Sequence, residues 1–197
     1  MGRQNRKDTT ESVRILLPAL IVIGGFAGTG KTKISKRLAI ELGIPRLGSD
    51  TIGRTIRNSA GIGKGEVKAH WIAYDVLFSL CEEFIRSGVS VVLDLTMGWE
   101  FQWEHIDGII GRHPEVSFLP IVLRCPYETC IERTRDRHEA APEQYDPPEV
   151  YETEPKNRSI WEYLTRLERP DVCFVSADRP HSEVYEEVRE HVSAAIA

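Results

Sequence analysis

Near the start of this chain, a glycine-rich loop lies between two apolar patterns of different period. The run Ala19–Ile23 is continuous and apolar, which is typical of a strand buried on both faces of a parallel sheet. After the loop, Lys31–Leu42 carries apolar residues at helical spacing and stops at Gly43, a residue favoured just past the end of a helix. A buried strand that passes through glycines into a helix is a repeating unit of parallel sheets covered by helices. The segment therefore predicts an α/β fold.

The loop itself, Gly25–Thr32, reads Gly-Phe-Ala-Gly-Thr-Gly-Lys-Thr and matches the pattern G-x-x-x-x-G-K-[ST] in full. The glycines let successive backbone N–H groups point at phosphate oxygens, and the helix start adds its positive dipole end. We expect Lys31 to reach the β- and γ-phosphates of ATP and the Thr32 hydroxyl to bind Mg²⁺. The other positions expected to bind the nucleotide are Gly25, Ala27, Gly28, Thr29 and Gly30. The alternative is a coincidental glycine turn, and the strand and helix on either side argue against it.

The same alternation continues to the end of the chain. Further strands are expected at Pro45–Gly48, Val89–Leu95, Ser117–Leu123 and Val172–Ser176. Helices are expected from Thr51, over Glu66–Arg86, Glu100–Gly111, Tyr127–His138 and Lys156–Leu167, and from Ser182. The proline-rich, acidic stretch Ala140–Pro155 is expected to be irregular. The sequence thus predicts a three-layer α/β P-loop NTPase fold with a five-stranded, mostly parallel sheet and a helical lid at about residues 126–155.

Composition and charge exclude several classes of protein. Of the 197 residues, 41% are hydrophobic and 28% charged, as in ordinary globular domains, so we expect a flexible tail over residues 1–16 and a single domain over 17–197. The net charge of −5 argues against a broad nucleic-acid surface, which needs a basic face. No apolar run has the length of a membrane span, and the four cysteines are scattered. We expect a cytoplasmic protein with reduced thiols and no membrane partner.

Missing motifs narrow the choice among proteins that carry this loop. The chain has neither the Asn-Lys-x-Asp motif of guanine recognition nor the Leu-Ser-Gly-Gly-Gln signature of transporters. Asp94, at the end of the third expected strand, is followed by Leu95 where many motor ATPases carry a glutamate base. These absences favour phosphoryl transfer to an acceptor over GTP switching or mechanical ATP hydrolysis.

Three segments taken together, Gly24–Thr32, Leu47–Asp50 and Val91–Asp94, resemble the small P-loop kinases of the AAA_33 type. That group includes chloramphenicol phosphotransferase-like, polynucleotide 5′-kinase-like and archaeal 2-phosphoglycerate kinase-like enzymes. The resemblance covers about residues 21–137. It implies an ATP-dependent enzyme that moves the γ-phosphate of Mg-ATP to a hydroxyl group, and it does not specify the acceptor.

Two aspartates follow neighbouring strands of the expected sheet. The resemblance implies that Asp50 takes the proton of the acceptor hydroxyl, and an aspartate at the carboxyl end of a parallel strand lies where such sheets bind ligands. The alternative for Asp50 is an N-cap of the helix expected from Thr51. Asp94 resembles the acid that holds magnesium through water. A second alternative makes Asp94 the base and leaves Asp50 to bind the acceptor.

Arginines form two further groups of candidates. Arg133 and Arg137 resemble the lid arginines of these kinases, and their spacing of four places both on one helix face, from which they could close over the phosphates. The alternative is a solvated face that pairs with Glu132 and Asp136. The resemblance also implies an arginine three residues after Asp50. That position holds Gly53, with Arg54 and Arg57 nearby as weaker acceptor-binding candidates, so the departure argues against a phosphorylated acceptor.

Polar and aromatic side chains on the long helix and after the third strand are the remaining acceptor-site candidates. They are Trp71 and Trp99, together with His70, Tyr74, Gln102 and Trp103. Their alternative role is ordinary core packing.

The expected partner is a small molecule with a hydroxyl group. A polynucleotide or nucleoside 5′-hydroxyl kinase is the alternative within the same class, and the acidic charge argues against it. From another class comes a regulatory NTPase that binds nucleotide without a dedicated acceptor.

Overall fold

The computed structural model describes residues 18–59 and 67–196, and this part of the chain contains a five-stranded sheet. The strands are β1 (Ala19–Gly25), β2 (Arg46–Gly48), β3 (Val91–Asp94), β4 (Ser117–Arg124) and β5 (Cys173–Ser176). Their order across the sheet is β2-β3-β1-β4-β5, and each pairing is parallel. The five strands predicted from the sequence are confirmed, and the sheet is wholly rather than mostly parallel.

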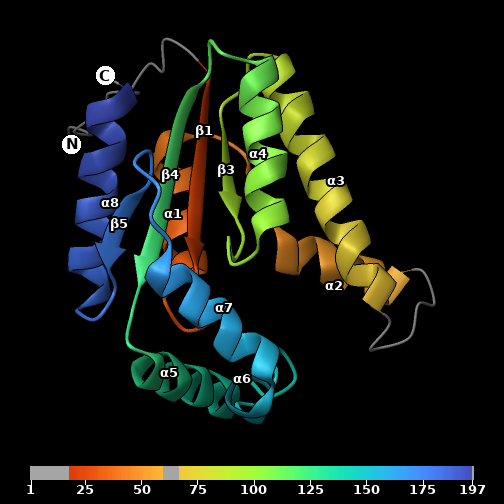
Figure 1. Ribbon diagram of the computed structural model, residues 1–197, viewed down its shortest axis with the longest axis vertical. Helices are drawn as coiled ribbons and strands as arrows, with labels where there is room; N and C mark the ends of the chain where they lie inside the picture. The colour runs from red at the N-terminus through yellow and green to blue at the C-terminus, as the bar shows by residue number, and fades with distance from the viewer. Residues whose placement is uncertain (1–17, 60–66, 197) are drawn as a thin grey trace, which may run out of the picture.

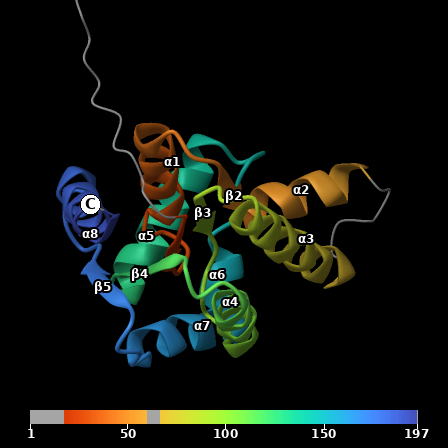
Figure 2. The same cartoon turned by 90° about the horizontal axis from the view of Figure 1, so that it is seen from above.

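Helices cover both faces of the sheet, which gives the three predicted layers (Figures 1 and 2). One face is covered by α1 (Lys31–Leu42) and α8 (His181–Ile196). The other face is covered by α3 (Val67–Arg86), α4 (Glu100–Arg112) and α7 (Pro155–Arg166). Beyond the carboxyl ends of the strands lie α2 (Ser49–Ser59), α5 (Tyr127–Ala140) and α6 (Glu149–Thr153) (Figure 1).

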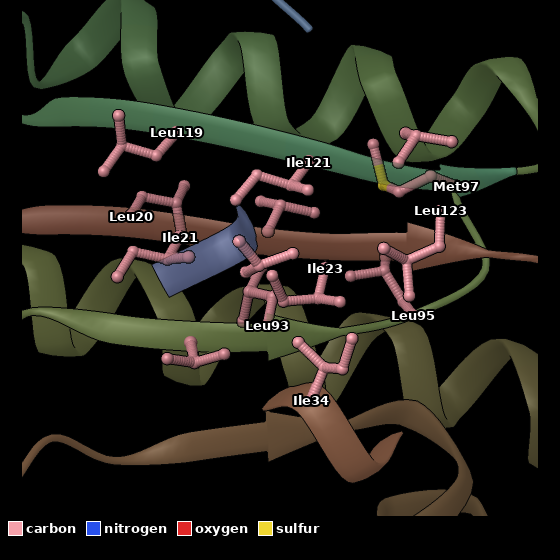
Figure 3. Packing of buried hydrophobic residues seen from close by; sticks show 14 of the residues in the cluster. Leu20, Ile21, Ile23, Ile34, Leu93, Leu95, Met97, Leu119, Ile121 and Leu123 are labelled. Carbon is pink, nitrogen blue, oxygen red and sulfur yellow. The ribbon is translucent and has the colours of Figure 1, made fainter. Parts of the chain in front are cut away.

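The central strand β1 lies in the middle of the hydrophobic core, and all seven of its residues are buried. Figure 3 shows Ile23 of β1 beside Leu93 of β3, with Ile34 of α1 packed against them. A strand with helices on both faces needs apolar side chains on both, which explains why Ala19–Ile23 is apolar without alternation.

Strand register brings the predicted site residues to one edge of the sheet. Ile23 of β1 and Gly48 of β2 are both aligned with Asp94 of β3. The glycine-rich loop follows β1, and Asp50 follows β2. Since ligands of open parallel sheets bind outside the carboxyl ends of the strands, this edge is the candidate site.

The stretch Ala140–Pro155 is not wholly irregular, contrary to the prediction, because it contains α6 and the first residue of α7. Proline is tolerated at the start of a helix, where the backbone N–H has no helical partner. Pro148 stands just before α6, and Pro155 begins α7. The Asn157 side chain donates to the carbonyl oxygen of Val150 at 2.7 Å and ties the two short segments together. The prolines therefore start helices here.

Other differences from the predicted boundaries are small. α2 begins at Ser49, two residues earlier than predicted, and β1 extends to Gly25. The predicted N-terminal tail over residues 1–16 lies outside the described residues. The cysteines Cys81, Cys125, Cys130 and Cys173 are free thiols, as predicted. No helix in the described ranges is long and apolar enough to cross a membrane.

Candidate active site at the carboxyl edge of the sheet

The glycine-rich loop has the backbone conformation that its sequence predicts. Gly28 and Gly30 have φ angles of 83° and 90°, in the left-handed region that favours glycine. Gly28 also lies against α5, because a side-chain carbon at this position would overlap the carbonyl oxygen of Cys130. Only glycine therefore fits at position 28. α1 begins at Lys31, immediately after Gly30, so its free N–H groups and positive dipole end face the loop.

Within this loop, the two polar side chains predicted to touch phosphate and metal are available. Lys31 and Thr32 are half-buried, and neither side chain has a hydrogen bond or ion pair with any residue in the described ranges. Thr29 differs, because it is buried and its hydroxyl donates to the carbonyl oxygen of Phe26 at 2.8 Å. Its side chain therefore shapes the loop. Ala27 is half-buried.

Asp50 lies in the first turn of α2, directly after β2, and it is exposed. Its carboxylate accepts no hydrogen bond from the described part of the chain, so the N-cap interpretation is not supported. The negative charge of Asp50 contributes to the raised pKa of two tyrosines. Burial raises the pKa of Tyr151 to about 12, with contributions from Asp146 and Asp50. Burial also raises the pKa of Tyr74, again with a contribution from Asp50. Asp50 therefore lies near Tyr74 of α3 and Tyr151 of α6, with no hydrogen bond or ion pair to its carboxylate in the described ranges.

The second aspartate, Asp94, is buried and occupied. Its Oδ2 atom forms an ion pair with Arg46 of β2 and accepts a hydrogen bond from Ser35 of α1 at 3.1 Å. Sequence reasoning missed both partners. One signal was available, because Arg46 is a charged residue in the predicted strand Pro45–Gly48, and a buried charge needs a partner.

The predicted lid arginines are held by neutral groups. Arg133 donates to the carbonyl oxygen of Ala177 at 2.9 Å, and the Arg137 guanidinium lies 4.5 Å from the ring centre of Tyr145. Neither forms an ion pair with Glu132, Asp136 or another carboxylate of the described ranges, so the pairing expected in the alternative of a solvated basic face is not observed there. The Nε atom of Arg137 is buried and has no hydrogen-bond partner there. Among the described residues, no carboxylate competes for either cation.

The two arginines of α2 differ in their distance from Asp50. Arg54 is exposed and follows Asp50 by four residues, so the two share a helix face. Arg57 is half-buried and lies nearly a further turn along α2, which leads away from the sheet edge in Figure 1. Arg54 is the better placed of these two candidates.

Aromatic rings from α3 and the start of α4 form a continuous cluster near Asp50. The ring centres of Trp71 and Phe101 are 4.9 Å apart, and those of Tyr74 and Trp99 are 6.3 Å apart. Trp71 is half exposed, whereas Tyr74 is buried with its hydroxyl close to the side chains of Ser49 and Gln102. Tyr74 thus connects the cluster to the first turn of α2.

The structure corrects or leaves open the other predicted aromatic and polar candidates. Trp103 is 1% exposed and donates from its indole N–H to the carbonyl oxygen of Met97 at 3.2 Å, so its main role is core packing. Gln102 is fully buried, and its amide atoms have no hydrogen bond of ordinary geometry within the described chain. The side chain of His70 lies outside the described residues.

Two cavities lie beside this edge and contain neither Lys31 nor Asp50. One, of about 600 Å³, lies between α4 and α7. The other, of about 540 Å³, lies between α1 and α8 and is lined by the cations Lys33, Lys36 and Arg37 together with His181. Burial, with Lys33 and Arg37, lowers the pKa of His181 and favours its neutral form. Cavity volume alone therefore does not locate the acceptor.

Several solved structures share this fold at low sequence identity. A gluconokinase from Sinorhizobium meliloti is 19% identical, covers 91% of this chain and 94% of its own, and superposes with a TM-score of 0.57. Shikimate kinase from Aquifex aeolicus is 20% identical, with coverages of 89% and 96% and a TM-score of 0.60. The Mycobacterium tuberculosis APS kinase CysC, solved with AMPPNP and APS, is 16% identical, with coverages of 90% and 98% and a TM-score of 0.59.

No curated protein matches the sequence. The family model described as an AAA domain, AAA_33, matches residues 20–152, which is more than half of the chain and includes the glycine-rich loop, both aspartates and the lid arginines. The family resemblance inferred from the sequence is therefore confirmed, and the chain belongs to the AAA_33 family of P-loop proteins.

Proposed function

We propose that this protein is an ATP-dependent kinase that transfers the γ-phosphate of Mg-ATP to a hydroxyl group of a small molecule. The observation that carries the proposal is the exposed carboxylate of Asp50, which has no hydrogen bond or ion pair within the described residues and lies at the sheet edge that also holds the phosphate-binding loop. A nucleotide-binding protein without an acceptor has no need for an unpaired carboxylate at this position.

The comparisons support a small-molecule acceptor. The chain spans more than nine tenths of the gluconokinase and of shikimate kinase, so the fold of a complete small-molecule kinase fits within it. The net charge of −5 argues against a polynucleotide acceptor.

In the proposed mechanism, the loop N–H groups and Lys31 hold the triphosphate and place the γ-phosphorus beside the acceptor. Arg133 and Arg137 neutralise charge on the transferring group from the lid side. The free hydroxyl of Thr32 and the unpartnered Oδ1 of Asp94 are oxygen donors of the kind that Mg²⁺ takes, so these residues fit the metal. When bound with the nucleotide, Mg²⁺ would offset the negative charge of the β- and γ-phosphates.

The assignment of the base follows from what each carboxylate already binds. Oδ2 of Asp94 is occupied by a guanidinium and a hydroxyl, and it is buried. Asp50 has neither restriction, so we assign it the role of accepting the proton while the acceptor oxygen attacks phosphorus. Asp94 is assigned to the metal side.

The test is ATP turnover measured with and without a panel of hydroxylated metabolites, including sugars, shikimate-like cyclic alcohols, nucleosides and a 5′-hydroxyl oligonucleotide. The proposal requires strong stimulation by at least one small molecule and a phosphorylated product. If ATP hydrolysis is slow and no acceptor stimulates it, the regulatory NTPase is supported instead. If only the oligonucleotide is phosphorylated, the acceptor class is wrong.

A further inference from the structure

A buried ion pair that the proposed reaction does not use links three elements behind the phosphate-binding loop. Arg46 of β2 bonds Oδ2 of Asp94 through Nη2, and its Nε donates to the hydroxyl of Ser35 at 2.8 Å. Ser35, in turn, lies 3.1 Å from the same Oδ2 and 3.2 Å from the carbonyl oxygen of Thr32. The exposed fractions are 15% for the Arg46 side chain and 3% for that of Asp94. This arrangement is a closed network, and one carboxylate oxygen is its centre.

The chain provides a dedicated space for the guanidinium. Arg46 and Gly48 are two residues apart on one strand and so face the same side, and Gly48 is aligned with Asp94 on the neighbouring strand. A side-chain carbon at position 48 would lie 2.9 Å from Nη2 of Arg46. The arginine thus passes over a glycine to reach the carboxylate. A side chain at position 48 would crowd the guanidinium.

The fixed cation changes what Asp94 can attract. A buried carboxylate near a phosphate site would draw a divalent cation, but one already paired with a guanidinium has no net charge to offer. No group of three or more His, Cys, Asp or Glu side chains in the described ranges could hold a metal ion by itself. The triphosphate of a bound nucleotide would supply the missing negative charge.

We propose that Arg46 is a positioning residue that makes divalent-metal binding at Asp94 depend on the presence of nucleotide. Its guanidinium neutralises Asp94 and occupies Oδ2, which leaves Oδ1 as the one carboxylate oxygen without a partner among the described residues. The inference rests on the proposed function in one respect, because it assumes that the metal enters together with ATP.

The test uses Mn²⁺ as the metal, with free Mn²⁺ followed by electron paramagnetic resonance in the absence and presence of AMPPNP. The wild-type protein should bind Mn²⁺ at this site only with AMPPNP. The Arg46→Gln variant should bind Mn²⁺ without nucleotide at least about tenfold more tightly than wild type. Arg46→Lys, which keeps a positive charge, should stay close to wild type. If Arg46→Gln shows no gain, the proposal is wrong.

Two controls separate the effect from general damage to the fold. Arg124→Gln removes another partly buried arginine, one that donates to the carbonyl oxygens of Leu164 in α7 and Leu167 just after it, and it should leave Mn²⁺ binding unchanged. The double variant Arg46→Gln/Asp94→Asn should lose the gained site, and retention of that site would refute the assignment to Asp94. Should Arg46→Gln fail to fold, wild-type protein that binds Mn²⁺ equally well with and without AMPPNP also overturns the proposal.

The outcome is independent of the acceptor. A gain of Mn²⁺ binding in Arg46→Gln with no kinase activity toward any acceptor would sink the proposed function and leave this inference standing. Kinase activity toward an acceptor, with no gain of Mn²⁺ binding in Arg46→Gln, would support the proposed function and overturn this inference.

Discussion

Asp50 and Asp94 are the same residue type, each at the carboxyl end of one of two adjacent parallel strands, yet their surroundings are opposite. Asp50, in the first turn of α2, is exposed and has no partner in the part of the chain that the structure describes, whereas Asp94 is 4% exposed and bonded to an arginine and a serine. The difference shows that strand position alone does not give a carboxylate its chemistry. The side chains that the neighbouring strand and helix place beside a carboxylate decide whether that carboxylate can exchange a proton or only hold a charge.

The largest expected effect concerns Lys31, the lysine of the phosphate-binding loop. Lys31→Ala should lower kcat by roughly 10³-fold or more, because it removes the cation that positions the β- and γ-phosphates. The melting temperature should stay near wild type, since the Lys31 side chain makes no hydrogen bond or ion pair in the described part of the chain. Steady-state kinetics together with a thermal melt check this. Near-normal turnover would remove the loop from the mechanism.

Asp50→Asn is the substitution that tests one side of the comparison. We expect kcat to fall by about 10² to 10⁴, the usual contribution of a general base, with ATP affinity unchanged. Because Asp50 is exposed and unpaired, its loss should change the free energy of unfolding by no more than about 0.5 kcal/mol. The measurements are kcat, ATP binding by calorimetry and denaturant unfolding. A defect confined to ATP affinity would transfer Asp50 to the metal side.

Asp94→Asn tests the other side, and its expected signature is the reverse. The substitution leaves the Arg46 guanidinium without a charge partner in a mostly buried position, so we expect a loss of stability on the order of 3 kcal/mol. Its activity defect should shrink as Mg²⁺ concentration rises, whereas that of Asp50→Asn should not. Denaturant unfolding and Mg²⁺ titrations of both variants give the answer. Equal metal dependence of the two variants would erase the distinction between the aspartates.

The smallest expected effect lies in the lid. We expect the lid to cover Asp50 when nucleotide binds and to leave Asp94 unaffected. Hydrogen exchange across residues 140–155 should slow when AMPPNP and Mg²⁺ bind, because Arg133 and Arg137 would dock on the triphosphate and draw this segment over the Asp50 side. Arg137→Ala should weaken that protection and leave exchange in the buried β3 unchanged. Protection of the phosphate-binding loop without any change over 140–155 would contradict the lid assignment.

The fold and the conformation of the glycine-rich loop could be predicted from the sequence because they rest on local patterns. The apolar run Ala19–Ile23, the glycines of the loop and the amphipathic helix after it each leave a signature within a few residues. The shared edge then follows from the rule that ligands bind outside the carboxyl ends of parallel strands, whereas the strand order was not predicted.

The partners of individual side chains could not be predicted, because they join segments far apart in the chain. Arg46 and Asp94 are separated by 48 residues, and nothing near either one indicates the other. Trp103 was predicted as a possible acceptor contact, because aromatic residues that pack in the core and aromatic residues that contact a ligand follow the same spacing in a sequence. The helix α6 was missed because clustered prolines are typical of loops as well as of helix starts.

The open space at Gly48 has an evolutionary consequence. An alanine there would put a carbon 2.9 Å from Nη2 of Arg46, so the guanidinium would have to shift away from the position in which it bonds Asp94. Positions 46 and 48 are therefore expected to vary together among descendants of a common ancestor, with glycine at 48 favoured in lineages that keep the arginine at 46.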